Sequence, residues 1–281
     1  MKFKCIFIMI SLSSFQIKAQ QDTTIKKTTI TAAVLSNSNV SYYGQSTNEK
    51  LPYILVNATL RLPSGLYFSV GSYKLLNYGS GLSETDLGLG FDHDFNDKLN
   101  LGAAYTHSFF PANSPLLRAA NDNNLNFSAT YALPYFKSAF SIDYSFGEQN
   151  DVFLSLTNSK EITLGSFFNE KNLFYIEPAL ELVAGTMNFY KTYTITKGKR
   201  DQSKGKAATF PGNSGSSTIS TTNVESSSFN LLSYNFKLPL SFSRANYVAE
   251  LNYQFSVLGP KAQEELKKQQ SYFGVAFYYQ F

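Results

Sequence analysis

The chain has 281 residues with 24 basic and 20 acidic side chains, and its formal net charge of +4 argues against a nucleic-acid-binding surface. A single cysteine rules out both a disulfide framework and a cysteine-based metal site. The aromatic content is high, with 25 Phe, 19 Tyr and no Trp, while only 16% of the residues are charged.

The first nineteen residues have the three parts of a secretory signal peptide. Lys2 and Lys4 precede the apolar run 5–15, and Ala19 offers a cleavage point before Gln20. The run is too short to span a bilayer, although a buried N-terminal strand is an alternative interpretation. We predict a signal peptide over 1–19 and one mature domain over 20–281. Cleavage would remove the cysteine and three lysines, which lowers the net charge from +4 to +1.

Alternation of apolar and polar residues dominates the mature sequence and predicts β-strands. In 51–76, one face carries Ile54, Val56, Ala58 and Leu60, and the other carries Tyr53, Asn57, Thr59 and Arg61. Pro63-Ser64-Gly65 would form the turn, with residue 62 paired to residue 66. No run of 18 apolar residues occurs, so the sequence predicts no transmembrane helix. Alternation of this kind is typical of a membrane β-barrel.

Twelve strands are predicted in all, with ten or fourteen as alternatives. They cover 28–36, 51–62, 66–76, 85–95, 99–110, 125–133, 138–146, 160–168, 173–190, 229–242, 247–257 and 271–281. The count is least certain near residue 158, because Asn158 and Lys160 would share a face with Val152 and Leu154. Either a strand extends beyond the bilayer there, or a turn adds two strands.

Connection lengths predict how the strands are joined. Short turns follow alternate strands, whereas the other connections include the long segments 37–50, 110–122, 195–223 and 259–270. Short periplasmic turns and long external loops are typical of an up-and-down barrel in the outer membrane. Unpaired backbone groups are costly in hydrocarbon. The all-β, antiparallel barrel should therefore close by pairing 28–36 with the last strand.

The last strand resembles the C-terminal signature of bacterial outer-membrane proteins. Phe277, Tyr279 and Phe281 share one face, and the final residue is aromatic. This resemblance implies recognition by the barrel-assembly machinery. Residues 40–95 also resemble a Bacteroidetes-like group of uncharacterised outer-membrane barrels, through Gly65-Leu66-Tyr67 followed by Glu84-Thr85-Asp86. The second resemblance implies no activity.

Catalytic patterns are absent from the sequence, so we predict neither an enzyme nor a cofactor or metal site. Lipolytic barrels need a serine beside a histidine base. His107 and Ser108 are sequence neighbours, but neighbours on a strand point to opposite faces. The predicted register places His107 opposite Leu87 and Ser108 opposite Asp86.

The inner face of the predicted barrel collects ionisable residues. Candidate pore-lining residues are Arg61, Asp86, Asp92, Lys137, Asp143, Glu177, Glu181, Lys237 and Glu250, and Glu161 is placed on the same face. One interpretation is a network of ion pairs that fills the lumen. The other is a narrow polar pore with a mild cation preference, because acidic linings attract cations.

Three functions remain open from the sequence. The first is a narrow porin-like channel for small polar solutes, the second is a structural or surface-adhesion barrel, and the third is a lipid-modifying enzyme. The loop 195–223 holds five basic residues between 197 and 206 and is either a solvated surface loop or a contact for lipopolysaccharide phosphates. Outer-membrane lipids and lipopolysaccharide are therefore the expected surroundings, in the cell outer membrane.

Overall fold

A computed structural model describes residues 27–112, 114–166, 172–190, 228–262 and 266–281. The predicted signal peptide, the turn before residue 172 and the whole of loop 195–223 lie outside these ranges. In chain order, the strands are β1 (Thr29–Asn37), β2 (Tyr53–Arg61), β3 (Leu66–Leu75), β4 (Glu84–Asp94), β5 (Leu99–Phe109), β6 (Asn123–Ala132), β7 (Lys137–Phe146), β8 (Asn150–Ser159), β9 (Ile162–Gly165), β10 (Asn172–Ile176), β11 (Ala179–Gly185), β12 (Asn230–Arg244), β13 (Tyr247–Leu258) and β14 (Gln269–Gln280). Within the described ranges, no helix is both long and apolar enough to cross a membrane.

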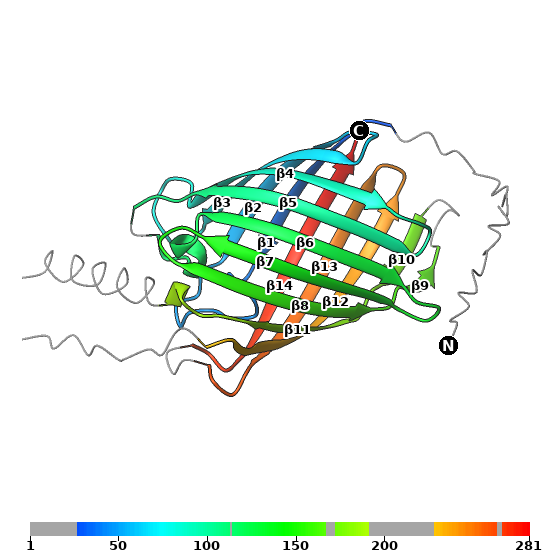
Figure 1. Ribbon diagram of the computed structural model, residues 1–281. Coiled ribbons are helices and arrows are strands. Elements are labelled where there is room, and N and C mark those ends of the chain that lie inside the picture. The colour runs from blue at the N-terminus through cyan, green and yellow to red at the C-terminus, as the bar shows by residue number, and fades with distance from the viewer. Residues whose placement is uncertain (1–26, 113, 167–171, 191–227, 263–265) are drawn as a thin grey trace, which may run out of the picture.

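Twelve of these strands close into an antiparallel barrel (Figure 1). Strands β1 to β8 pair in sequence, β8 pairs with β11, and β11 pairs with β12. The ring is sealed by β14, which pairs with β1 through Val34 opposite Phe277. The predicted fold class and the predicted closure of the first strand on the last are therefore confirmed. Closure satisfies the edge hydrogen bonds that an open sheet would leave unpaired in hydrocarbon.

The two remaining strands, β9 and β10, extend the barrel wall beyond its rim at the short-turn end (Figure 1). Strands β10 and β11 share one register on β12 and form a single strand interrupted at Pro178, which has no backbone N–H to donate. Strand β7 begins at Lys137, opposite Ser159, so β9 continues past it and pairs with β10 alone in the described sheet.

This extension corrects two predicted strands. The barrel strand is Asn150–Ser159 rather than 160–168, and the predicted strand 173–190 is divided into β10 and β11. For the second of these, the sequence pattern failed because it gave no weight to Pro178. Of the two explanations for the polar pair near residue 158, the extension beyond the barrel applies, and the barrel keeps twelve strands.

The predicted hairpin registers are confirmed. Leu62 N–H donates to the Leu66 carbonyl at 2.8 Å, and Gly65 takes a φ of +95° that a side chain would disfavour. In the next hairpin, the Asn96 side-chain oxygen accepts hydrogen bonds from the N–H groups of Lys98 and Leu99, which fixes the turn.

Side chains alternate around the wall as the sequence predicts. The outward residues are exposed and apolar, among them Ile54, Val56, Leu60, Phe68, Val70, Leu87, Leu89, Phe91, Leu251, Val275 and Phe277. Tyr279 and Phe281 are exposed as well. An apolar outer surface of this extent favours contact with hydrocarbon, since water-soluble proteins rarely expose so large an apolar area.

Charge on this outer surface should therefore be costly. We expect Val56→Arg, at a side chain that is 53% exposed, to lower the free energy of unfolding in lipid vesicles by about 2–4 kcal/mol. Thr163→Arg on β9 is the matched control, because β9 lies beyond the rim and should tolerate the charge. Urea unfolding followed by circular dichroism measures both. Equal costs at the two positions would contradict the membrane assignment of the outer surface.

Candidate functional site in the lumen

The connection between β1 and β2, residues 38–52, places a tight hairpin inside the barrel. Tyr42 and Gln45 exchange backbone hydrogen bonds of 2.8 and 2.9 Å, and the two residues between them have φ values of +51° and +79°. Positive φ at both central positions is the type I′ turn, which glycine at the second position favours. We call residues 42–45 the lumen hairpin.

The lumen hairpin contacts the inner wall of the barrel at β12, three strands from β1 around the closed sheet. The Ser233 hydroxyl on β12 donates to the Tyr43 carbonyl at 2.8 Å. Gly44 lies so close to β12 that a Cβ atom would be 2.5 Å from the Asn235 side-chain oxygen. Ser233 and Asn235 are fully buried and alternate with the exposed Tyr234 and Phe236, so they face the interior. The connection therefore folds into the lumen and docks on β12.

Aromatic rings pack inside the lumen beside this contact. Tyr43 stacks on Phe153 of β8 at a centroid distance of 3.8 Å, and Tyr42 meets Phe189 edge-on at 5.0 Å. Phe153 and Phe189 are fully buried. Burial raises the pKa of Tyr42 and of Tyr43 well above the usual value, so both phenols stay neutral hydrogen-bonding groups. The result is an apolar block in the half of the barrel nearest the long loops.

Two polar chambers border the lumen hairpin, and Tyr43 lines both. The first has a volume of about 320 Å³ and is lined by Asn37, Asn39, Ser41, Tyr43, Gly44, Tyr53, Glu181, Lys237, Asn252, Gln254 and Tyr272. The second has a volume of about 300 Å³ and is lined by Tyr42, Tyr43, Asp86, Thr106, Ser108, Arg118, Asn121, Asn123, Asn124, Asp143 and Ser145. Amides, hydroxyls and a few charges dominate both linings.

The predicted pore-lining residues lie on the interior face, and six of them form ion pairs. Nitrogen to oxygen distances are 2.5 Å for Arg61–Asp92, 3.1 Å for Lys137–Glu177 and 2.9 Å for Lys237–Glu181. Each pair joins residues from neighbouring or nearby strands. Together the pairs include every basic residue of the predicted pore-lining set. Their charges therefore cancel locally.

The three other predicted residues are carboxylates held by neutral donors. Asp86 accepts from the Ser108 hydroxyl at 2.6 Å, Asp143 from the Asn126 amide at 2.8 Å, and Glu250 from the Ser241 hydroxyl at 3.2 Å. Glu161, predicted on the same face, lies past the end of the barrel strand β8. It is exposed at the break between β8 and β9, where the regular alternation ends, and lies in a hollow beside the β6–β7 turn.

Sequence reasoning missed a buried ion pair that holds the 110–122 loop. Arg118, in the short 3-10 helix Leu117–Ala120, forms an ion pair with Glu84, whose side chain is 0% exposed. The guanidinium also lies 4.5 Å from the centre of the Tyr73 ring and 3.9 Å from the Asp86 carboxylate. An arginine directly after Leu116-Leu117 was the available signal, because two leucines in a loop indicate burial.

Sequence reasoning also missed Asp151, whose carboxylate accepts hydrogen bonds from two of the long connections between strands. It is fully buried on β8 and accepts hydrogen bonds from the Asn121 amide at 2.9 Å and the Thr186 hydroxyl at 2.6 Å. Backbone N–H groups of Asn188 and Phe189 donate at 2.7 and 2.8 Å. Four donors stabilise a carboxylate that has no ion pair among the described residues.

Both histidines of the chain lie on outward faces. His107 contacts the Asn123 side-chain oxygen at 2.9 Å, and its ring packs on Phe109, while Ser108 points inward to Asp86. The predicted pairing of 107 with 87 and 108 with 86 is confirmed. His93 packs between the rings of Phe91 and Phe95. In the described ranges, no cluster of three His, Cys, Asp or Glu side chains is arranged to hold a metal ion.

A closed barrel with an apolar outside and a polar, hydrogen-bonded inside is the architecture of outer-membrane β-barrel proteins. No family model and no curated protein matches the sequence. Among solved structures, the KdgM porin aligns over 89% of this chain and 99% of its own, at 9% identity and a TM-score of 0.49. The NanC porin aligns over 88% and 98%, at 7% identity and 0.46. LpxR from Salmonella typhimurium aligns over 89% and 99%, at 8% identity and 0.48.

Proposed function

We propose that the protein is a narrow channel of the outer membrane for small polar solutes, constricted by the lumen hairpin. The observation that carries this proposal is the pair of polar chambers, about 320 and 300 Å³, that remain on either side of Tyr43. A barrel with a purely structural role has no need for water-sized polar space in its interior. The aromatic block makes the passage narrow and its opening dependent on the hairpin.

The charge of the lumen favours cations and neutral solutes over anions. Asp143 and Glu250 have no basic partner in the described part of the chain. Glu84 and Asp86 share one arginine. Because the other charged side chains of the lumen are paired, the net charge of the lumen is negative. Acidic linings attract cations. Small cationic or hydroxylated solutes are therefore the proposed substrate class.

Planar bilayer recordings test this proposal. The protein should give discrete conductance steps and a reversal potential that indicates cation preference in a salt gradient. Asp143→Asn and Glu250→Gln together should move the reversal potential toward zero, because they remove lumen charge. Glu161→Gln, outside the lumen, is the matched control and should leave the reversal potential unchanged. A silent bilayer at high protein dose would refute transport.

The aromatic block favours a second candidate function, a structural or surface-adhesion barrel with a closed lumen. A silent bilayer would support it. Several partner assignments stay predictions in either case: export by residues 1–19, lipopolysaccharide contact through 195–223, and recognition of Phe277, Tyr279 and Phe281 by the assembly machinery.

A further inference from the structure

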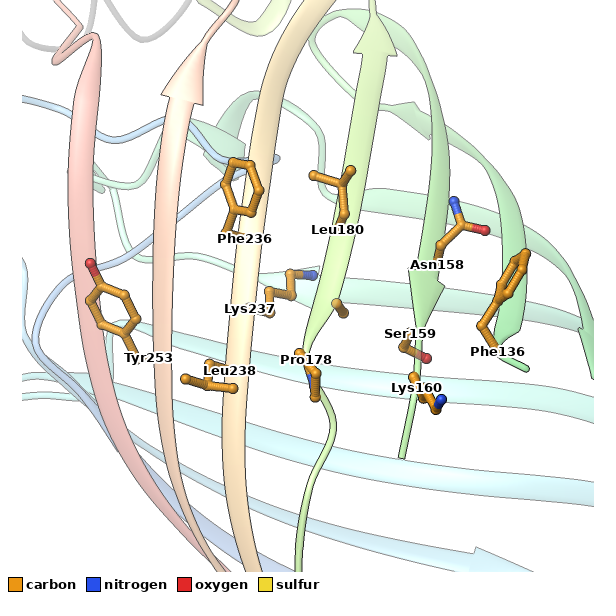
Figure 2. Close-up of a pocket in the computed structure, with 11 residues that line it drawn as sticks. Phe136, Asn158, Ser159, Lys160, Pro178, Leu180, Phe236, Lys237, Leu238 and Tyr253 are labelled. Atoms are coloured by element: carbon orange, nitrogen blue, oxygen red, sulfur yellow. The ribbon is translucent and has the colours of Figure 1, made fainter. Parts of the chain in front are cut away.

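A groove of about 530 Å³ interrupts the outer wall where β8, β11 and β12 meet (Figure 2). Ser159 and Ala179 line it together with the ring of Pro178, and their register places both in the inward row of the wall with Lys137 and Lys237. Pro178 has no backbone N–H to donate, and the regular strand is interrupted there, between β10 and β11. Larger side chains around Ser159, Pro178 and Ala179 form the sides of the groove.

The groove faces hydrocarbon. Leu180, Phe236 and Leu238 line it, and all three are exposed members of the outward apolar set. Phe136, from the β6–β7 turn, borders the groove at the end of β8 (Figure 2). A membrane barrel offers such a groove to the lipid around it, and an acyl chain is the occupant whose apolar surface matches this lining.

A second hollow of about 260 Å³ adjoins the groove at the short-turn rim and shares Phe136 and Lys160 with it. Of the basic residues at the two sites, Lys137 and Lys237 are paired with Glu177 and Glu181.

The Lys160 ammonium has no ion-pair partner within the described ranges. The Glu161 carboxylate lines the same hollow. This rim therefore offers one ammonium group and one carboxylate beside an apolar groove.

We propose that the groove and the hollow together bind one phospholipid of the periplasmic leaflet. Its acyl chain lies between Leu180 and Phe236, and its phosphate pairs with the Lys160 ammonium. A headgroup that also carries a primary ammonium, as in an ethanolamine phospholipid, satisfies Glu161. Charge complementarity at one end and apolar contact along the other distinguish this site from the surrounding wall, where most outward side chains are apolar.

Native mass spectrometry of the delipidated barrel, titrated with an ethanolamine phospholipid, tests the proposal. Lys160→Glu should weaken binding of the first lipid roughly tenfold, because it replaces attraction of the phosphate by repulsion. Asn158→Phe should weaken it to a similar degree by filling the groove from its outward face. The matched controls are Lys98→Glu, in the β4–β5 turn at the same rim, and Leu156→Phe, higher on β8 and outside the groove. Both controls should bind as the parent does.

Unchanged affinity in Lys160→Glu or Asn158→Phe would overturn the site. Diacylglycerol, which has the chains without the phosphate, should bind at least tenfold more weakly, and equal binding would overturn the role of Lys160. A choline phospholipid that binds as tightly as the ethanolamine lipid would overturn the pairing with Glu161. Mobility of the unheated protein in electrophoresis checks folding of each variant, and Lys160→Gln replaces Lys160→Glu if the latter does not fold.

Discussion

Gly44→Val should raise the single-channel conductance several-fold. The native φ of +79° suits glycine and strains a β-branched residue, at a cost of roughly 1–2 kcal/mol or more. The new side chain would also overlap β12, since a Cβ alone would lie 2.5 Å from the Asn235 oxygen and closer still to the Ser233 hydroxyl. The lumen hairpin must then leave this wall, and Tyr43 loses its stacking on Phe153. Planar bilayer recordings measure the change.

The matched control is Gly79→Val in the loop between β3 and β4. Gly79 also has a positive φ, of +59°, but a Cβ there meets no atom within 4 Å. Valine at position 79 should therefore strain the backbone to a similar degree. Because Gly79 lies away from the lumen hairpin, the substitution should not affect the contact between the hairpin and β12. Conductance should stay at the parent level. If Gly44→Val conducts no better than Gly79→Val, the hairpin does not constrict the passage.

The wall of the barrel could be predicted from the sequence because its pattern is local. Alternation in 51–62 and 85–95 identifies the outward face, and the turn at 63–65 fixes the register of its neighbour. Closure follows from the need to satisfy edge hydrogen bonds, so pairing of β1 with β14 needs no further information. The division of the strand predicted over 173–190 had a local cause as well, namely Pro178.

The content of the lumen could not be predicted, since it depends on contacts between segments that are far apart in sequence. The Tyr43 ring stacks on Phe153, 110 positions later, and no periodicity connects them. The sequence presented 37–50 as an external loop, and only the three-dimensional arrangement shows part of it folded inward. Glu84 likewise begins a strand as an ordinary polar residue, and its burial depends on a loop arginine 34 positions later.

Arg118→Met should lower the free energy of unfolding in lipid vesicles by about 3–5 kcal/mol, because it leaves the buried Glu84 carboxylate without its cation. In the native site, one oxygen of the Glu84 carboxylate has no hydrogen-bond partner among the described residues, so few polar contacts would remain once Arg118 is removed. Hydration of that carboxylate would require the 110–122 loop to leave the wall. Faster amide hydrogen exchange at residues 117–120 should accompany the loss of stability.

Two further variants separate the buried charge from the loss of an arginine in general. Arg61→Met removes the partner of Asp92, but both side chains are well exposed, at 44% and 29%, so the cost should be at most about 1 kcal/mol. Glu84→Leu combined with Arg118→Met should recover most of the stability, because it removes the unpaired charge together with its partner. A double variant as unstable as Arg118→Met alone would mean that packing of the arginine against Tyr73, rather than charge, holds the loop.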